Sequence, residues 1–232
     1  MIDMVGLDGD DTLWHSESHF VVTEDALADL LSPYAEPTDL RLRMLATERR
    51  NLALFGYGVK GFTLSMIETA IEVSNGQVSV AEIQAIIDAG KGLLAHPVEL
   101  LDGVTEAIDA LSGRVRLVVI TKGDLFHQES KAAASGLVDR VEGIEIVAEK
   151  DIATYRRILA RHAVAPDRFL MVGNSVRSDI LPVLELGSHA AHVPYHVTWE
   201  VEVVEPPDVG HERFRALTSL RDLPALLDEL GA

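Results

Sequence analysis

The chain lacks cysteine altogether, which excludes a cysteine nucleophile, a zinc–thiolate site and any disulfide bond. Basic residues are scarce, since 20 Lys and Arg stand against 37 Asp and Glu among 232 residues. The resulting net charge of −17 disfavours binding to a nucleic-acid polymer or to an anionic membrane. No apolar run approaches the ~18 residues of a membrane span. The acidic first 14 residues lack the basic and apolar regions of a signal peptide, so we expect a soluble cytoplasmic protein.

Hydrophobic residues are plentiful at 47% of the chain, which is enough for a sizeable core. Short apolar runs have the length of buried strands, and helical patterns separate the later ones. The runs cover residues 4–7, 117–120, 144–147 and 169–172, and the helical patterns cover 104–111, 125–134, 152–162 and 180–186. This alternation predicts parallel βαβ units, and therefore an α/β protein with a Rossmann-like parallel sheet.

The stretch 15–95 has a different character, because it contains helical patterns and no convincing strand. Amphipathic helices are expected at 19–31, 38–54, 63–74 and 80–93. We therefore predict a discontinuous α/β core, residues 1–14 and 96–232, with an all-helical domain inserted at 15–95. An insert directly after the first strand is expected over the carboxyl end of that strand, where ligands bind in open parallel sheets.

Polar groups follow all four apolar runs of the predicted sheet. The segments are DGDDT at 8–12, TK at 121–122, EK at 149–150 and GNSVRSD at 173–179. Parallel strands bring these ends to one edge, which then carries carboxylates, a hydroxyl, an ammonium and an amide. A carboxylate can attack phosphorus, and a second one can serve as general acid and base. Carboxylates alone repel a phosphate, so such a site needs Mg²⁺ together with lysine and hydroxyl donors.

The four segments resemble the motifs of the haloacid dehalogenase superfamily, most of whose members are phosphatases, and they occur in the same order. The helical insert is similar to the common C1-type cap of that family. The resemblance implies that Asp8 is the nucleophile and a metal ligand. It implies that Asp10 is the general acid and base and lends its main-chain carbonyl to Mg²⁺. Thr121 and Lys150 are then expected to bind the phosphoryl oxygens.

The resemblance also implies that Asn174 and Asp179 complete the magnesium site. Asn174 is a departure, because the family usually has Asp at this position. An amide oxygen can bind Mg²⁺ but carries no negative charge. Which of the two residues binds the metal directly is therefore left open.

Three further cations are candidate substrate-binding residues. Lys122 and Arg177 lie beside motif residues, and Lys60 lies in the glycine-rich stretch GYGVKGF of the insert. A flexible, glycine-flanked loop in a cap can reach a substrate and select it. For each of the three, a solvated surface position is the equally simple interpretation.

The expected function is Mg²⁺-dependent hydrolysis of a small phosphorylated metabolite through an aspartyl-phosphate. A 2-haloacid dehalogenase of the same fold is an alternative, although those enzymes use no metal and lack the equivalent of Asp10. A phosphotransferase or sugar-phosphate mutase would use the same motifs. A fourth hypothesis is a non-catalytic binding protein, and Asn174 is the one feature that favours it. The physiological substrate and the oligomeric state are not readable from the sequence.

Overall fold

The computed structural model describes residues 1–208 and 210–231. The described chain divides into two compact units. The core unit comprises Met1–Ser16 and the chain from Val98 onward, and the helical unit comprises Glu17–Pro97. The two boundaries between the units, after residues 16 and 97, each lie two residues beyond the predicted boundaries after residues 14 and 95. No helix among the described residues is both long and apolar enough to cross a membrane.

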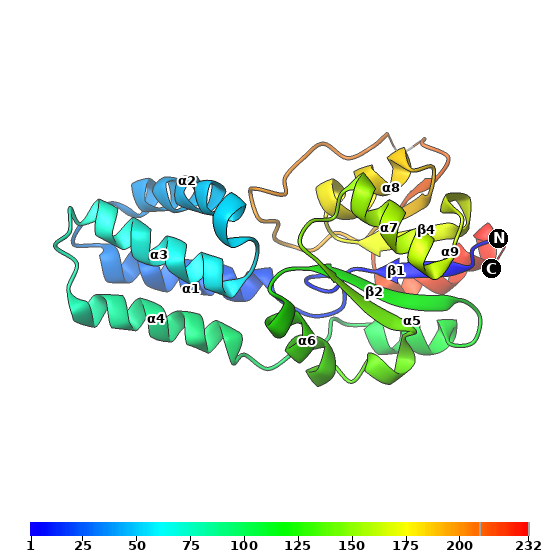
Figure 1. The fold of residues 1–232 in the computed structure, drawn as a ribbon, viewed down its shortest axis with the longest axis horizontal. Coiled ribbons are helices and arrows are strands. Elements are labelled where there is room, and N and C mark those ends of the chain that lie inside the picture. Colours follow the sequence, from blue (N-terminus) through cyan, green and yellow to red (C-terminus); the bar gives the residue numbers. More distant parts are fainter. Residues whose placement is uncertain (209, 232) are drawn as a thin grey trace. The chain divides into compact units, whose positions relative to one another are not determined.

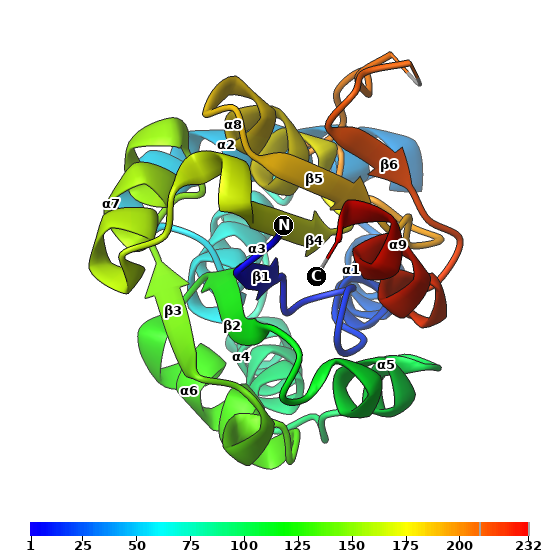
Figure 2. The same ribbon diagram turned by 90° about the vertical axis from the view of Figure 1, so that its right-hand side faces the viewer.

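Within the described part of the core unit, six parallel strands form one sheet in the order β3-β2-β1-β4-β5-β6 (Figure 2). The strands are β1 (Met4–Leu7), β2 (Arg116–Lys122), β3 (Gly143–Val147), β4 (Phe169–Gly173), β5 (His189–His192) and β6 (Phe214–Ala216). The predicted parallel α/β core is confirmed. Strand β1 pairs with both β2 and β4, so the strand order changes direction beside β1, and ligands bind at such a point in open α/β sheets.

Helices cover both faces of this sheet (Figure 2). One apolar core joins the sheet to α5 (Val104–Leu111), α6 (Leu125–Ala134) and α9 (Leu223–Leu230). A second joins the other face to α7 (Ile152–His162) and α8 (Leu181–Glu185). Strand β1 is buried on both sides, which explains why its sequence is apolar throughout rather than alternating. The strand ends are thereby held rigidly, and the polar residues that follow them are placed by the sheet.

The helical unit contains α1 (Glu17–Leu31), α2 (Pro37–Phe55), α3 (Val59–Val73) and α4 (Val80–Leu94), labelled in Figure 1. Its own apolar core includes Leu31, Leu40 and Met66, all nearly inaccessible. Helix α4 begins with a capping box, in which Ser79 accepts from the main-chain N–H of Glu82 and the Glu82 carboxylate accepts from that of Ser79. An all-helical insert after β1 is therefore observed.

The position of Lys60 corrects a sequence-based expectation. Helix α3 begins at Val59 rather than at residue 63, so Lys60 lies exposed in the first turn of a helix and not in a flexible loop. Gly58, with a φ of 107°, allows the chain to turn directly into the helix. The expected glycine-flanked loop at Lys60 is wrong for this reason.

The segment after β4 also differs from expectation. The sequence predicts a helix over 180–186, whereas the structure has a π-helical turn at Val176–Ile180 that leads into α8. The hydroxyl of Ser175 caps this turn by accepting from the Ser178 N–H at 3.1 Å. Single π-helical turns are frequently found at functional sites. Here the turn carries Asp179.

Candidate functional site

Asp8 directly follows β1 and is 6% exposed. Its N–H donates to the carbonyl of Val172 at 2.9 Å, which extends the contact between β1 and β4. Thr12 Oγ1 donates to Asp8 Oδ2 at 3.0 Å and accepts from the Asn174 N–H at 3.0 Å. The turn that contains Asp8 is therefore fixed to the end of β4 by a threonine hydroxyl.

Lys150 meets two of the sequence-predicted carboxylates. Its side chain is 2% exposed, and its ammonium donates to Asp8 Oδ1 and, at 2.7 Å, to Asp179 Oδ1. The three residues come from the ends of β1, β3 and β4. The structure thus brings together side chains that lie 29 and 142 positions apart along the chain.

This cluster contains two buried carboxylates and one ammonium. Burial raises the pKa of Asp8 to about 7, and repulsion from Asp179 adds to this, while Lys150 opposes both. Burial alone would lower the pKa of Lys150, but Asp179 and Asp8 outweigh it and the pKa is raised. The ammonium is therefore charged, and the cluster has more carboxylate groups than ammonium groups.

A glycine permits the approach of Asp179 to this cluster. A Cβ atom on Gly173 would lie 2.2 Å from Asp179 Oδ2, so any side chain there would displace the carboxylate. The N–H of Ser175 donates to the same oxygen at 3.0 Å. The segment 173–179 therefore folds closely around one carboxylate.

The residues around Asp8 fit a divalent cation in their chemistry. The oxygen donors are the carboxylates of Asp8 and Asp179 and the amide of Asn174, whose Oδ1 lies 3.3 Å from Thr12 Oγ1. Among the described residues, no group of three or more His, Asp or Glu side chains is arranged to hold a metal ion. Mg²⁺ is usually held by only one or two carboxylates together with waters and substrate oxygens. The excess of carboxylate groups over ammonium groups and the oxygen donors are thus compatible with Mg²⁺.

Asp10 accepts hydrogen bonds from side chains other than those that donate to Asp8. Its carboxylate accepts from Trp14 Nε1 at 2.6 Å, from Gln128 Nε2 at 3.0 Å and from the ammonium of Lys131. Burial opposes ionisation, but Lys131, Gln128 and Trp14 together hold the pKa of Asp10 below its usual value. Asp10 is consequently ionised and oriented by three donors.

Thr121 occupies the end of β2 and is 1% exposed. Gln128 Nε2 also lies 3.1 Å from its hydroxyl oxygen. A Cβ atom on Gly9 would lie 3.1 Å from the same oxygen and 2.8 Å from the ring of Trp14. The turn after β1 therefore packs directly against Thr121 because Gly9 has no side chain.

Gln128 and Lys131 are residues that the sequence analysis missed. They lie three positions apart on α6, the helix that follows β2, and this spacing places both on one helix face. A polar pair at helical spacing just after a motif-bearing strand end is the signal that could have revealed them. What they contact was not readable, because Asp10 lies 118 and 121 positions away.

Two of the other predicted cations, Lys122 and Arg177, have partners other than Asp8. Lys122 Nζ forms an ion pair with Glu202 at 2.6 Å and donates to Ser178 Oγ at 2.8 Å. Arg177 is exposed and donates to the carbonyl of Val201 at 2.7 Å. Lys60 belongs to the helical unit. In the core unit, Lys150 contacts Asp8, whereas Lys122 and Arg177 contact the segment that follows β5.

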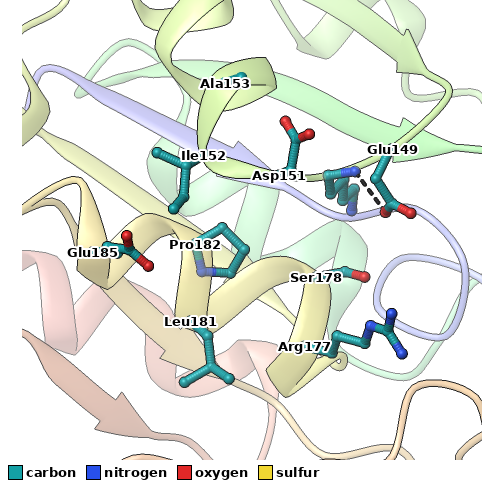
Figure 3. A pocket seen from close by; sticks show the side chains of 10 residues that line it. Glu149, Asp151, Ile152, Ala153, Arg177, Ser178, Leu181, Pro182 and Glu185 are labelled. Carbon is teal, nitrogen blue, oxygen red and sulfur yellow. Dashed lines mark hydrogen bonds between the residues drawn. The ribbon is translucent and has the colours of Figure 1, made fainter.

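A groove of about 520 Å³ adjoins the cluster (Figure 3). It lies between residues 149–153, which lead into α7, and residues 177–185, and both Lys150 and Ser178 line it. Its acidic lining residues are Glu149, Asp151 and Glu185. These carboxylates disfavour an anionic ligand, so the groove is less suited to a phosphate than the surroundings of Asp8 and Lys150.

Comparisons with known proteins agree with this architecture. A family model of haloacid dehalogenase-like hydrolases matches residues 2–187. The solved structure of a haloacid dehalogenase-like family hydrolase from Xanthomonas campestris is 44% identical, with a TM-score of 0.89 over 99% of this chain and 91% of that one. No curated protein sequence matches the chain.

Two more distant structures share the fold alone. A predicted phosphoglycolate phosphatase from Haemophilus somnus 129pt is 15% identical, with a TM-score of 0.65 over 97% of each chain. An L-2-haloacid dehalogenase from Xanthobacter autotrophicus is 15% identical, with a TM-score of 0.66 over the whole of both chains. The family match over most of the chain and the 44% identity decide its membership. The chain belongs to the haloacid dehalogenase-like hydrolases.

Proposed function

We propose that this hydrolase is a cytoplasmic, Mg²⁺-dependent phosphatase that acts on a small phosphorylated metabolite through an aspartyl-phosphate on Asp8. The observation that carries the proposal is the contact of the Lys150 ammonium with the Asp8 and Asp179 carboxylates at the end of β1. The presence of Asp10, oriented by three donors beside Thr121, favours a phosphatase over a dehalogenase. Asp8, Asp10, Thr121 and Lys150 are the proposed catalytic residues.

In the first step, an oxygen of Asp8 attacks phosphorus, and the bond from phosphorus to the ester oxygen breaks. The leaving oxygen takes a proton from the carboxyl of Asp10. The Thr121 hydroxyl and the Lys150 ammonium donate to the phosphoryl oxygens, whose charge they stabilise. Mg²⁺ would be held by Asp8, by the main-chain carbonyl of Asp10, and by Asn174 and Asp179, one of them directly and the other through water. It would supply further positive charge for those oxygens.

In the second step, water attacks the phosphorus of the aspartyl-phosphate and Asp10 takes its proton, which releases phosphate and restores the Asp8 carboxylate. Lys131, Gln128 and Trp14 hold the pKa of Asp10 below its usual value, which favours the carboxylate form that acts as the base. To act as the acid, it must take up a proton or separate from Lys131 as the substrate binds. Lys131 therefore favours the ionised form of Asp10 and helps to orient its carboxylate.

The proposal is tested by measuring phosphate release from a panel of phosphoglycolate-like acids, sugar phosphates and nucleoside monophosphates, with and without Mg²⁺. We expect at least one good substrate, hydrolysed only when Mg²⁺ is present. Halide release from a 2-haloacid without Mg²⁺ would replace the proposal with a dehalogenase. Transfer of the phosphoryl group to an added sugar, in place of phosphate release, would identify a phosphotransferase.

Binding of Mg²⁺ should release a proton near neutral pH. The pKa of Asp8 is raised to about 7, and a metal binds the ionised carboxylate. At pH 7 we expect about half a proton to be released per metal ion, because a group is half protonated at its pKa. Calorimetric titration in buffers of different ionisation enthalpy measures this number. Affinity should rise with pH up to about 7 and then level off, and a pH-independent affinity would contradict a role for Asp8 as ligand.

Replacement of Lys131 by Met should lower the rate of hydrolysis, and the size of the loss should depend on the leaving group of the substrate. We expect a loss of about a hundredfold for an alkyl phosphate, because its leaving oxygen needs a proton from a correctly oriented Asp10 and Lys131 helps to orient that carboxyl group. An aryl phosphate with a nitrophenol leaving group needs no such proton and should lose far less. Lys131→Arg keeps the charge and should retain most of the activity. Equal losses of kcat/KM, which reports the first step alone, for both substrates would contradict an action of Lys131 through Asp10 as the acid.

A further inference from the structure

Glu202 lies in the segment 193–213 between β5 and β6, yet its side chain is almost fully buried. One carboxylate oxygen accepts from Lys122 Nζ at 2.6 Å. The other accepts from the hydroxyls of Ser175 and Ser178, each at 2.6 Å. Both oxygens of the carboxylate therefore accept hydrogen bonds. The pKa of Glu202 is lowered, because Lys122 and the two serines outweigh the effect of burial.

The partners of Glu202 come from two strand ends that are not neighbours. Lys122 is the last residue of β2, and both serines belong to the segment after β4. In the sheet, β1 lies between β2 and β4 (Figure 2). Glu202 therefore links the strand ends on either side of the one that Asp8 follows.

Glu202 is connected to Asp179 through a single residue. The hydroxyl of Ser175 donates to Glu202, and the N–H of the same residue donates to Asp179 Oδ2 at 3.0 Å. The second partner, Ser178, precedes Asp179 directly in the chain. The position of the Asp179 carboxylate is thereby tied to a residue that is far from any family motif.

Three other residues of this segment, Val193, Tyr195 and Val201, also contact the motif-bearing regions. The N–H of Val193 donates to Gly173 at 3.0 Å, and Val201 accepts from Arg177 at 2.7 Å. The hydroxyl of Tyr195 lies 2.7 Å from Nδ1 of His15, which follows the first motif. Glu202 therefore provides the ion pair of a segment that contacts the regions around His15, Lys122 and Ser175.

We propose that Glu202 is a positioning residue that holds Ser175 and Ser178, and through them Asp179, while it neutralises Lys122. This inference rests on the proposed function, because Asp179 is a proposed metal ligand. It also assigns Lys122 a different role, as the ion-pair partner of Glu202 rather than a substrate-binding cation. The ammonium lies 3.8 Å from Glu149 as well, which adds to this neutralisation.

The test compares Glu202→Gln with Glu205→Gln, which removes the same charge from an exposed position of the same segment. We expect Glu202→Gln to weaken Mg²⁺ binding, measured by calorimetry without substrate, by about tenfold to a hundredfold. The Mg²⁺ concentration for half-maximal phosphate release should rise equally, and saturating Mg²⁺ should restore most of kcat. Glu205→Gln should match the wild type. An unchanged Mg²⁺ affinity in Glu202→Gln would overturn the proposal.

Two further variants keep the test decisive if Glu202→Gln folds poorly. Ser175→Ala removes the hydroxyl that donates to Glu202 and caps the turn carrying Asp179, and it should weaken Mg²⁺ binding in the same direction. Lys122→Met combined with Glu202→Gln should lower the Tm by less than the sum of the single changes, because each single change leaves a buried charged or polar partner unpaired. Additive Tm losses would contradict the pairing. Failure of the wild type to bind Mg²⁺ or to release phosphate would instead refute the proposed function.

Discussion

Asp8→Asn is expected to abolish phosphate release, by at least about a thousandfold, without destabilising the fold. An amide has no anionic oxygen with which to attack phosphorus, so the aspartyl-phosphate cannot form. Asn has nearly the same shape as Asp and fits beside Thr12 and Lys150. Phosphate release is measured with the best substrate of the panel, and the fold is checked by circular dichroism.

The same substitution should leave stability unchanged or raise it at pH 8. The pKa of Asp8 is raised from 3.8 to about 7, so the folded state disfavours the ionised carboxylate relative to the unfolded chain. This penalty is full above about pH 7 and fades as the pH falls towards 4. The Tm advantage of Asp8→Asn should fade in the same way. A clear Tm loss at pH 8 would contradict the charge imbalance around Asp8.

Asp139→Asn is the matched control for this experiment. Asp139 is exposed in the core unit, and the same chemical change there should alter neither activity nor Tm. If Asp8→Asn kept more than about a tenth of the activity, Asp8 could not be the nucleophile, because the loss of a nucleophile costs orders of magnitude.

Lys150→Met should produce the largest stability loss. It removes the ammonium that the buried carboxylates of Asp8 and Asp179 share. Removal of one partner from a buried ion pair costs about 3–5 kcal/mol, since the remaining charge is left uncompensated. Urea unfolding at pH 8 measures this loss, which should shrink at lower pH as the Asp8 carboxylate takes up a proton. Activity should also be lost, because Lys150 is a proposed phosphoryl ligand.

The double variant Asp8→Asn/Lys150→Met separates charge from packing. It leaves one buried carboxylate in place of two, so it should be more stable than Lys150→Met alone. Equal stability of the single and double variants would mean that the loss comes from the missing lysine stem rather than from unpaired charge. Wild-type stability of Lys150→Met at pH 8 would contradict the ion pairs altogether.

Much of the core unit was predictable because its strands are buried on both faces. Such strands must be short and apolar throughout, and β1 and β4 are found where the apolar runs are. Parallel order follows from the helices between them, and the shared sheet edge follows from parallel order. The contact of Asp8 with Lys150 is therefore consistent with reasoning about strand ends, while the chemical roles of both residues stay predictions.

Local details were less predictable where a turn depends on one residue. The start of α3 at Val59 depends on the backbone freedom of Gly58, and the π-helical turn before α8 depends on contacts of Asp179 and Ser175. Hydrophobic periodicity does not report such contacts. The sequence predicted a loop at Lys60 because three glycines in six positions are typical of loops as well as of helix starts.

The sequence by itself determined the α/β class, the helical insert and the polar residues at the strand ends, because apolar runs and helical periodicity are local properties of a chain. Only the tertiary structure decided which charges pair: Lys131 with Asp10, Lys150 with Asp8 and Asp179, and Lys122 with Glu202. Each pair joins residues at least 29 positions apart. Pairing depends on the few ångströms between side chains in the folded protein, and charge interactions in a buried site are strong enough to make that distance decisive.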